Sequence, residues 1–152
     1  MKYQTLLLVL LVFALTVSAC ASTAAATSPT KDASPQPVAV EDQATLVAAL
    51  KAAGATVEAG ESVTQDFFSP EGNVIKVNGA DVQVFEYENT EAMENEASQV
   101  APDGGSVGTS MMMWIDTPHF YKAGRIIALY IGSDKTVLGV LEQVLGPQFA
   151  GK

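Results

Sequence analysis

Two residues of this 152-residue chain stand out for their chemistry, because Cys20 and His119 are each the only one of their type. A single thiol cannot form an internal disulfide or a cysteine-rich zinc site. His119 carries the only imidazole, the side chain that most readily exchanges a proton at neutral pH. Nucleophilic catalysis would also need a hydroxyl or thiol held beside it, and no Gly-x-Ser-x-Gly or comparable motif is present. We therefore favour a structural or hydrogen-bonding role for His119.

The acidic residues give the chain its charge, with 17 Asp and Glu against 8 Lys and Arg and a formal net charge of -9. This balance argues against nucleic acid as a partner, because phosphate binding needs clustered basic residues. Asp103, Asp116 and Asp134 occupy turn or cap positions, where local backbone roles explain them. No Asp-x-Asp-x-Asp-Gly calcium loop occurs, so we predict neither a metal nor a cofactor.

The N-terminus has the layout of a signal peptide. Lys2 precedes an apolar run from Leu6 to Val17, and two small residues follow before Cys20. The apolar run is shorter than the roughly 20 residues that a permanent membrane-spanning helix needs. We expect residues 1–19 to be removed by cleavage.

The tetrapeptide Val17-Ser18-Ala19-Cys20 resembles the lipobox of bacterial lipoproteins. The resemblance implies lipid attachment, including palmitate-type acyl chains, at Cys20. It also implies anchoring to the cell membrane or the outer membrane, with the domain facing the periplasm or the cell exterior. Two or three acyl chains would give a stable anchor. The alternative is an ordinary secretory signal that leaves Cys20 as a free thiol.

The composition predicts a tether followed by one domain. Residues 20–40 are rich in Ala, Ser, Thr and Pro and have no periodic apolar pattern, so we expect a flexible spacer. Residues 41–152 are enough for one hydrophobic core without disulfides.

Three helices are predicted in this domain. Asp42 is a plausible N-cap for a helix that ends near Gly54, and Asn89 or Thr90 could cap a second helix through about Gln99. In the last helix Ser133 is the expected cap, and an apolar stripe from Val137 to Leu145 ends at Gly146-Pro147.

The strands are predicted mainly from turns and apolar alternation. Residues 56–68 suggest an irregular strand pair or one bulged strand, and Asn78-Gly79 between two β-rich runs predicts a hairpin. Residues 111–115 and 125–131 suggest a second hairpin. The expected fold is α+β, with an antiparallel sheet of about four to six strands in two hairpins packed in two layers against about three helices.

Both faces of the predicted sheet are apolar, although a half-buried sheet normally has one polar face. One interpretation is that other parts of the chain, such as the segment around Phe67 and Phe68, cover the second face. The other is an exposed binding surface that would take an envelope protein or a small apolar ligand. The residues proposed for it are Trp114, Tyr130, Tyr87, Phe85, Met112 and His119.

The leading functional hypothesis is a lipid-anchored, extracytoplasmic binding or scaffolding domain that does no chemistry of its own. Its layout is similar to that of small bacterial envelope lipoproteins, which implies no particular activity. A small hydrolase using His119 with Asp116 or Asp103 is the first alternative. An inhibitor or accessory subunit that docks through an edge strand or the Gly-rich loop around Gly104 is the second.

Overall fold

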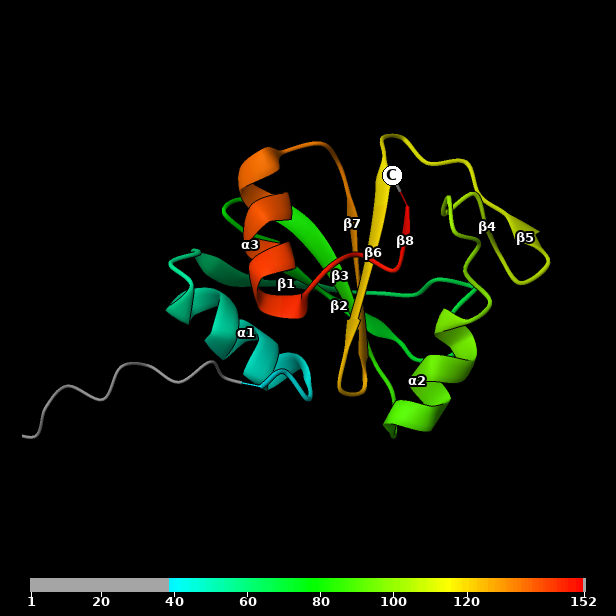
Figure 1. Ribbon diagram of the computed structural model, residues 1–152, viewed down its shortest axis with the longest axis horizontal. Coiled ribbons are helices and arrows are strands. Elements are labelled where there is room, and N and C mark those ends of the chain that lie inside the picture. The colour runs from blue at the N-terminus through cyan, green and yellow to red at the C-terminus, as the bar shows by residue number, and fades with distance from the viewer. Residues whose placement is uncertain (1–38, 152) are drawn as a thin grey trace, which may run out of the picture. The chain divides into compact units, whose positions relative to one another are not determined.

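An antiparallel sheet forms the centre of the computed structural model, which describes residues 39–151 (Figure 1). Within this range six strands pair in the order β1-β2-β3-β7-β6-β8, and a separate two-stranded ribbon pairs β4 with β5. The strands are β1 (Val57–Val63), β2 (Gly72–Val77), β3 (Ala80–Glu86), β4 (Ser106–Val107), β5 (Ser110–Met111), β6 (Pro118–Ala123), β7 (Ile126–Ile131) and β8 (Ala150–Gly151). The predicted α+β class with an antiparallel sheet is confirmed.

The helices within the described residues are α1 (Gln43–Ala52), α2 (Thr90–Ala97) and α3 (Lys135–Leu145). The predicted caps Asp42 and Asn89 are confirmed, since each side chain accepts a hydrogen bond from a backbone N–H of the first turn. The cap of α3 is Asp134 rather than the predicted Ser133. Its carboxylate accepts from the Thr136 N–H at 2.8 Å.

The first hairpin was correctly predicted from Asn78-Gly79. Both residues have positive φ, 52° and 87°, the combination that a two-residue turn between right-twisted strands requires. β1 then pairs with β2 as a single strand whose register shifts between Ala59 and Ser62. The bulged-strand alternative for residues 56–68 is therefore the one observed.

The second hairpin forms one segment later than predicted. Its first strand is β6 (Pro118–Ala123), whereas residues 112–116 are not in a strand. A proline fits β6 because it stands at the first position of the strand, where the missing N–H matters least. The continuous apolar run of residues 111–115 is instead a segment in which burial alternates, because only one of its sides packs against the domain.

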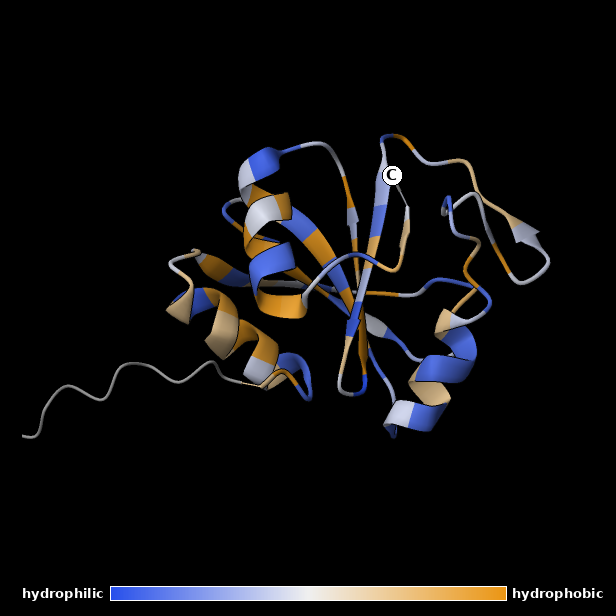
Figure 2. Ribbon diagram, in the orientation of Figure 1, coloured by the Kyte–Doolittle hydropathy of each residue, from blue (hydrophilic) through white to orange (hydrophobic). Residues whose placement is uncertain are grey.

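Both faces of the sheet are covered (Figure 1). Helices α1 and α3 pack on one face, where Leu46, Leu50 and Leu141 join the core. Helix α2 lies on the other face, and Met93 packs there with Phe68 and the strand residues. The alternation of hydrophobic and hydrophilic residues around α3 is visible in Figure 2. Coverage of the second face by the chain itself explains its apolar composition.

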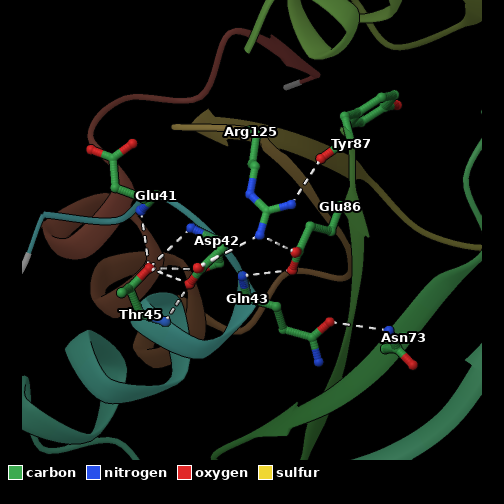
Figure 3. A network of polar contacts seen from close by, with 8 residues as sticks. All are labelled: Glu41, Asp42, Gln43, Thr45, Asn73, Glu86, Tyr87 and Arg125. Atoms are coloured by element: carbon green, nitrogen blue, oxygen red, sulfur yellow. Dashed lines mark hydrogen bonds and ion pairs between the residues drawn. The ribbon is translucent and has the colours of Figure 1, made fainter. Parts of the chain in front are cut away.

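Arg125 joins the start of α1 to the sheet (Figure 3). Its guanidinium lies 2.6 Å from Glu86 Oε1 and donates to the Tyr87 carbonyl at 3.1 Å. Its backbone N–H donates to the Glu41 carbonyl at 2.9 Å. The other oxygen of Glu86 accepts from the Gln43 N–H. This network fixes the point where the described chain begins, at the end of the sheet that holds the β6–β7 turn.

The predicted signal peptide, Cys20 and nearly all of the tether predicted for residues 20–40 lie outside the described residues. Among residues 39–151, no helix has the length and apolar character needed to cross a bilayer.

Candidate functional site

The aromatic residues predicted to form one surface lie on opposite faces of the sheet. Phe85 and Tyr87 are buried on the α2 side, where they are 0% and 4% exposed. Tyr130 is 5% exposed and belongs to the core beneath α1 and α3. Strand register is the reason, because Val82 stands opposite Tyr130 and Phe85 stands opposite Ile127. The single exposed platform expected from sequence does not form.

Trp114 and Met112 are half-buried and pack inward on the α2 side. The Trp114 ring makes edge contacts with the rings of Phe67 and Phe120, with centroids 6.0 and 5.9 Å apart. Its indole N–H donates to the Gly104 carbonyl at 2.7 Å. These contacts hold residues 112–116 against the domain.

The alternate residues of the same segment point away from the domain. Met111, Met113 and Ile115 are 89%, 98% and 97% exposed, and we call these three residues the exposed strip. Figure 2 shows hydrophobic residues along this part of the chain between β5 and β6. Residues two apart in an extended chain lie about 6.6 to 7 Å from one another on one side, so the strip has a regular spacing. Exposed apolar side chains gathered in this way are typical of interaction surfaces.

The backbone of the strip is also open. The Met112 N–H donates to the Gly105 carbonyl, but among the described residues no backbone bond joins residues 113–116 to another segment. An extended segment with free N–H and C=O groups can pair with an added strand.

An acidic pocket of about 570 Å³ adjoins the strip at Ile115, which lines both. Its charged lining consists of Asp81, Asp116 and Asp134, and its other lining residues include Gln83, Tyr130 and Ser133. Hydrogen bonds from the Thr136 side chain and backbone hold the pKa of Asp134 below its ordinary value, so this carboxylate stays ionised at neutral pH. The volume is in the range of ligand-binding pockets.

Acidic residues predominate around the strip, although Lys76 Nζ lies 2.6 Å from Oδ1 of Asp81 in the adjoining pocket. Residues 77–121, which include α2 and the exposed strip, contain no lysine or arginine, whereas acidic residues recur along them. Asp66 and Asp103 are exposed. Both lie near the strip, because Phe67, which follows Asp66, contacts the Trp114 ring, and Gly104, which follows Asp103, accepts the hydrogen bond from the Trp114 indole. The local potential therefore favours a cationic partner.

The strip lies far from the point where the described chain begins. Residues 112–117 precede β6, whereas Glu41 contacts the turn at the other end of that strand. Six residues of strand span roughly 20 Å. Figure 1 shows the β4–β5 ribbon and α1 on different sides of the sheet.

His119 occupies a different pocket, of about 240 Å³. The pocket lies beside α3, and its lining residues are His119, Tyr121, Leu138, Glu142, Pro147 and Gln148. The carboxylate that lines it is Glu142, not the Asp116 or Asp103 considered from sequence. None of these described lining residues is a serine, threonine or cysteine.

The Gly-rich loop is partly built into the core. Gly104 is buried with φ of 70°, and a Cβ there would come within 2.9 Å of the Pro118 ring. Across residues 39–151 no group of three His, Cys, Asp or Glu side chains is arranged to hold a metal ion. No family model, curated protein or solved structure matches the chain.

Sequence reasoning missed the exposed strip because it assigned Met111, Met113 and Ile115 to a strand of the main sheet. The only local signal was the length of the apolar run, which is continuous from Met111 to Ile115. Such a run is compatible with a strand buried on both sides or with a segment buried on one side.

Proposed function

We propose that this protein is a lipid-anchored binding domain of the bacterial cell envelope that docks a basic polypeptide segment on the exposed strip. One observation carries the proposal: three fully exposed apolar side chains lie in a row beside an acidic pocket. The domain itself acts by binding, without catalysis.

The strip suits an extended polypeptide. Burying a methionine or isoleucine side chain contributes on the order of 1.5 to 3 kcal/mol, so three of them can support specific docking. The free backbone of residues 113–116 can add hydrogen bonds to a partner strand. If this protein acts instead as an accessory subunit that docks through a loop, the exposed strip would be the docking surface.

The acidic pocket defines the charge of the partner. One oxygen of Asp116 accepts from the Thr117 N–H, and one oxygen of Asp134 accepts from Thr136. The second oxygen of Asp116 makes no hydrogen bond among the described residues, and both side chains line the pocket. A Lys or Arg side chain of the partner that enters the pocket would neutralise these charges. Apolar side chains next to it in the partner segment would then cover the strip.

The same charge disfavours a bilayer as the occupant of the strip. Anionic headgroups would be repelled by Asp66, Asp103 and Asp116. The strip also lies at the opposite end of β6 from the start of the described chain, where the proposed tether would join. The proposed tether would therefore join the domain at the end of β6 opposite the strip.

Anchoring at Cys20 rests on the lipobox resemblance of Val17-Ser18-Ala19-Cys20. Its test is metabolic labelling with a palmitate analogue in a bacterial host. Wild type should incorporate label and stay with membranes, and Cys20→Ser should do neither. Equal labelling of the two proteins would contradict the anchor.

Trp114 provides a direct assay for docking, because it is the only tryptophan of the chain and packs beneath the strip. The probes are two nine-residue peptides without tryptophan, one alternating Leu and Lys and the other alternating Leu and Glu. The Leu/Lys peptide should change the Trp114 emission saturably and bind at least about tenfold more tightly than the Leu/Glu peptide. Equal binding of the two peptides would refute a basic partner.

Two variants separate the parts of the surface. Replacing all three residues of the strip with serine should leave the unfolding midpoint nearly unchanged and weaken Leu/Lys binding at least about tenfold. Asp116→Asn should reduce the salt dependence of binding, while Glu41→Gln, at the opposite end of β6 from the strip, should not. If phosphatidylcholine vesicles shift the emission and the peptide does not, the strip is a membrane surface and the proposal fails.

A further inference from the structure

His119 is buried on the sheet face that α1 and α3 cover, and the proposed docking surface makes no use of it. Its side chain is 6% exposed and stacks on Tyr130, with ring centroids 6.1 Å apart and planes 21° apart. Each ring nitrogen of a buried imidazole needs a hydrogen-bond partner or access to solvent, since each is a strong donor or acceptor.

The partner of Nδ1 defines the tautomer. Nδ1 lies 2.6 Å from Oε1 of Gln148, and a carbonyl oxygen can only accept. Nδ1 therefore carries the proton and donates to Gln148. In the neutral ring this leaves Nε2 as a lone-pair acceptor.

Nε2 opens into the pocket beside α3. It has no hydrogen-bond partner among the described residues, and none of their fully buried side-chain nitrogen or oxygen atoms lacks a partner. Nε2 is thus accessible, and the cavity of about 240 Å³ that His119 lines is where a ligand can reach it.

The remaining lining gives this pocket a negative character. Glu142 contributes a carboxylate, and no lysine or arginine is among the described lining residues. Burial, followed by the nearby Glu142 charge, raises the pKa of Tyr121, so its hydroxyl stays neutral. Leu138 and Pro147 provide apolar walls. Two acceptors and apolar walls match a cation with a short alkyl chain.

We propose that this pocket binds a small primary ammonium compound whose nitrogen donates to Nε2 of His119 and pairs with the carboxylate of Glu142. The volume is below the several hundred Å³ typical of sites for drug-sized ligands, which limits the ligand to a few heavy atoms. This site is independent of the exposed strip, and neither proposal depends on the other.

Nuclear magnetic resonance tests the proposal on a single signal, because His119 is the only histidine of the chain. The ring ¹⁵N shifts of untagged, uniformly labelled protein at pH 8 should show the proton on Nδ1. A proton on Nε2 would overturn the proposal, since the ring would then present a donor to the pocket.

Titration with n-butylammonium should then move the His119 ring signals saturably, with a dissociation constant in roughly the millimolar range for so small a ligand. Butyrate has the same chain with the opposite charge and should leave the signals in place. Absence of a saturable shift with n-butylammonium, or an equal shift with butyrate, would refute an ammonium site.

A matched pair of variants tests the role of Glu142. Glu142→Gln keeps the shape of the side chain and should weaken n-butylammonium binding about tenfold. Glu91→Gln makes the same change of charge on α2, away from the pocket lining, and should leave binding unchanged. Equal weakening by both variants, in proteins with otherwise native amide spectra, would indicate diffuse attraction to an acidic protein and would refute the site.

Discussion

Gly124 shows how one residue couples the start of the domain to the sheet. It lies in the β6–β7 turn with φ of 53°, and a Cβ there would lie 2.3 Å from the Cα of Glu41. Glycine meets both demands, the left-handed backbone and the close approach. The neighbouring Arg125 makes the ion pair and hydrogen bonds of the same junction.

Gly124→Ala should therefore destabilise the fold by at least about 2 kcal/mol, as measured by urea unfolding. Gly139→Ala is the matched control, because Gly139 is exposed inside α3 and has no atom within 4 Å of a new Cβ. It should stabilise the protein by up to about 1 kcal/mol through helix propensity. Equal effects of the two substitutions would show that Glu41 does not pack as described.

The first helix is held by the charge and the hydrogen bonds of its cap. The Asp42 carboxylate accepts from the Thr45 N–H and hydroxyl, and Thr45 in turn accepts from the Asp42 N–H. These bonds, the backbone N–H of Thr45 first, lower the pKa of Asp42. A carboxyl whose pKa is lower in the folded state stabilises the fold above its unfolded value of about 3.9 and loses that contribution as pH falls through its folded pKa.

Asp42→Asn keeps a capping oxygen but removes the charge. The stability difference between wild type and this variant should be largest at pH 7 and should shrink as pH falls below about 4. Asp66→Asn serves as the control, because Asp66 is exposed and has no ion pair among the described residues. Urea unfolding at a series of pH values measures the difference, and a gap that is constant with pH would contradict the assignment.

The segment between β5 and β6 has two sides with different roles. On the inner side, Trp114 of the segment contacts the ring of Phe120 in β6. Phe120 is 0% exposed and also contacts the rings of Phe68 and Phe149. The outer side of the segment carries the exposed strip. Stability should therefore depend on the inner side alone.

Phe120→Ala should cost about 3 to 5 kcal/mol because it leaves a cavity under Trp114. Met113→Ala should change stability by less than about 0.5 kcal/mol, because the removed atoms are already in water. Guanidinium unfolding followed by Trp114 emission reports both. A large cost for Met113→Ala would show that the strip is packed against the domain in solution.

The domain as one body carries a large negative charge at neutral pH. Ion pairs within the described residues, such as Lys76 with Asp81 and Arg125 with Glu86, use several of its few basic side chains. The remaining acids repel one another and destabilise the compact state, and added salt screens this repulsion.

Raising sodium chloride from about 20 mM to about 500 mM at pH 7 should therefore raise the thermal midpoint by a few degrees, because the Debye length becomes shorter than the spacing of surface charges. Near pH 4.4, the isoelectric point expected from the full sequence, the same salt should have a smaller effect. Calorimetric scans at both pH values measure this. A lower midpoint in salt at pH 7 would mean that ion pairs outweigh repulsion.

Local chemistry made much of this fold predictable from sequence. Asp42 and Asn89 start helices because their side chains satisfy N–H groups of the first turn, and Asn78-Gly79 turns a hairpin because both residues tolerate positive φ. The alternation of Val82 and Val84 with Phe85 and Tyr87 correctly assigned these residues to two sheet faces. Each of these effects acts over a few residues, and a sequence displays it directly.

Strand order and register arise from contacts between residues far apart in the chain, and these are decided in the tertiary structure. Register places Tyr130 beside Val82 and away from Phe85, which removes the platform expected from their types. Packing of Trp114 against Phe67 and Phe120 leaves Met111, Met113 and Ile115 facing outward, and the hydrogen bond between His119 Nδ1 and Gln148 leaves Nε2 open to a pocket. Residue types indicated which side chains can bind, but only long-range packing determined which of them face solvent.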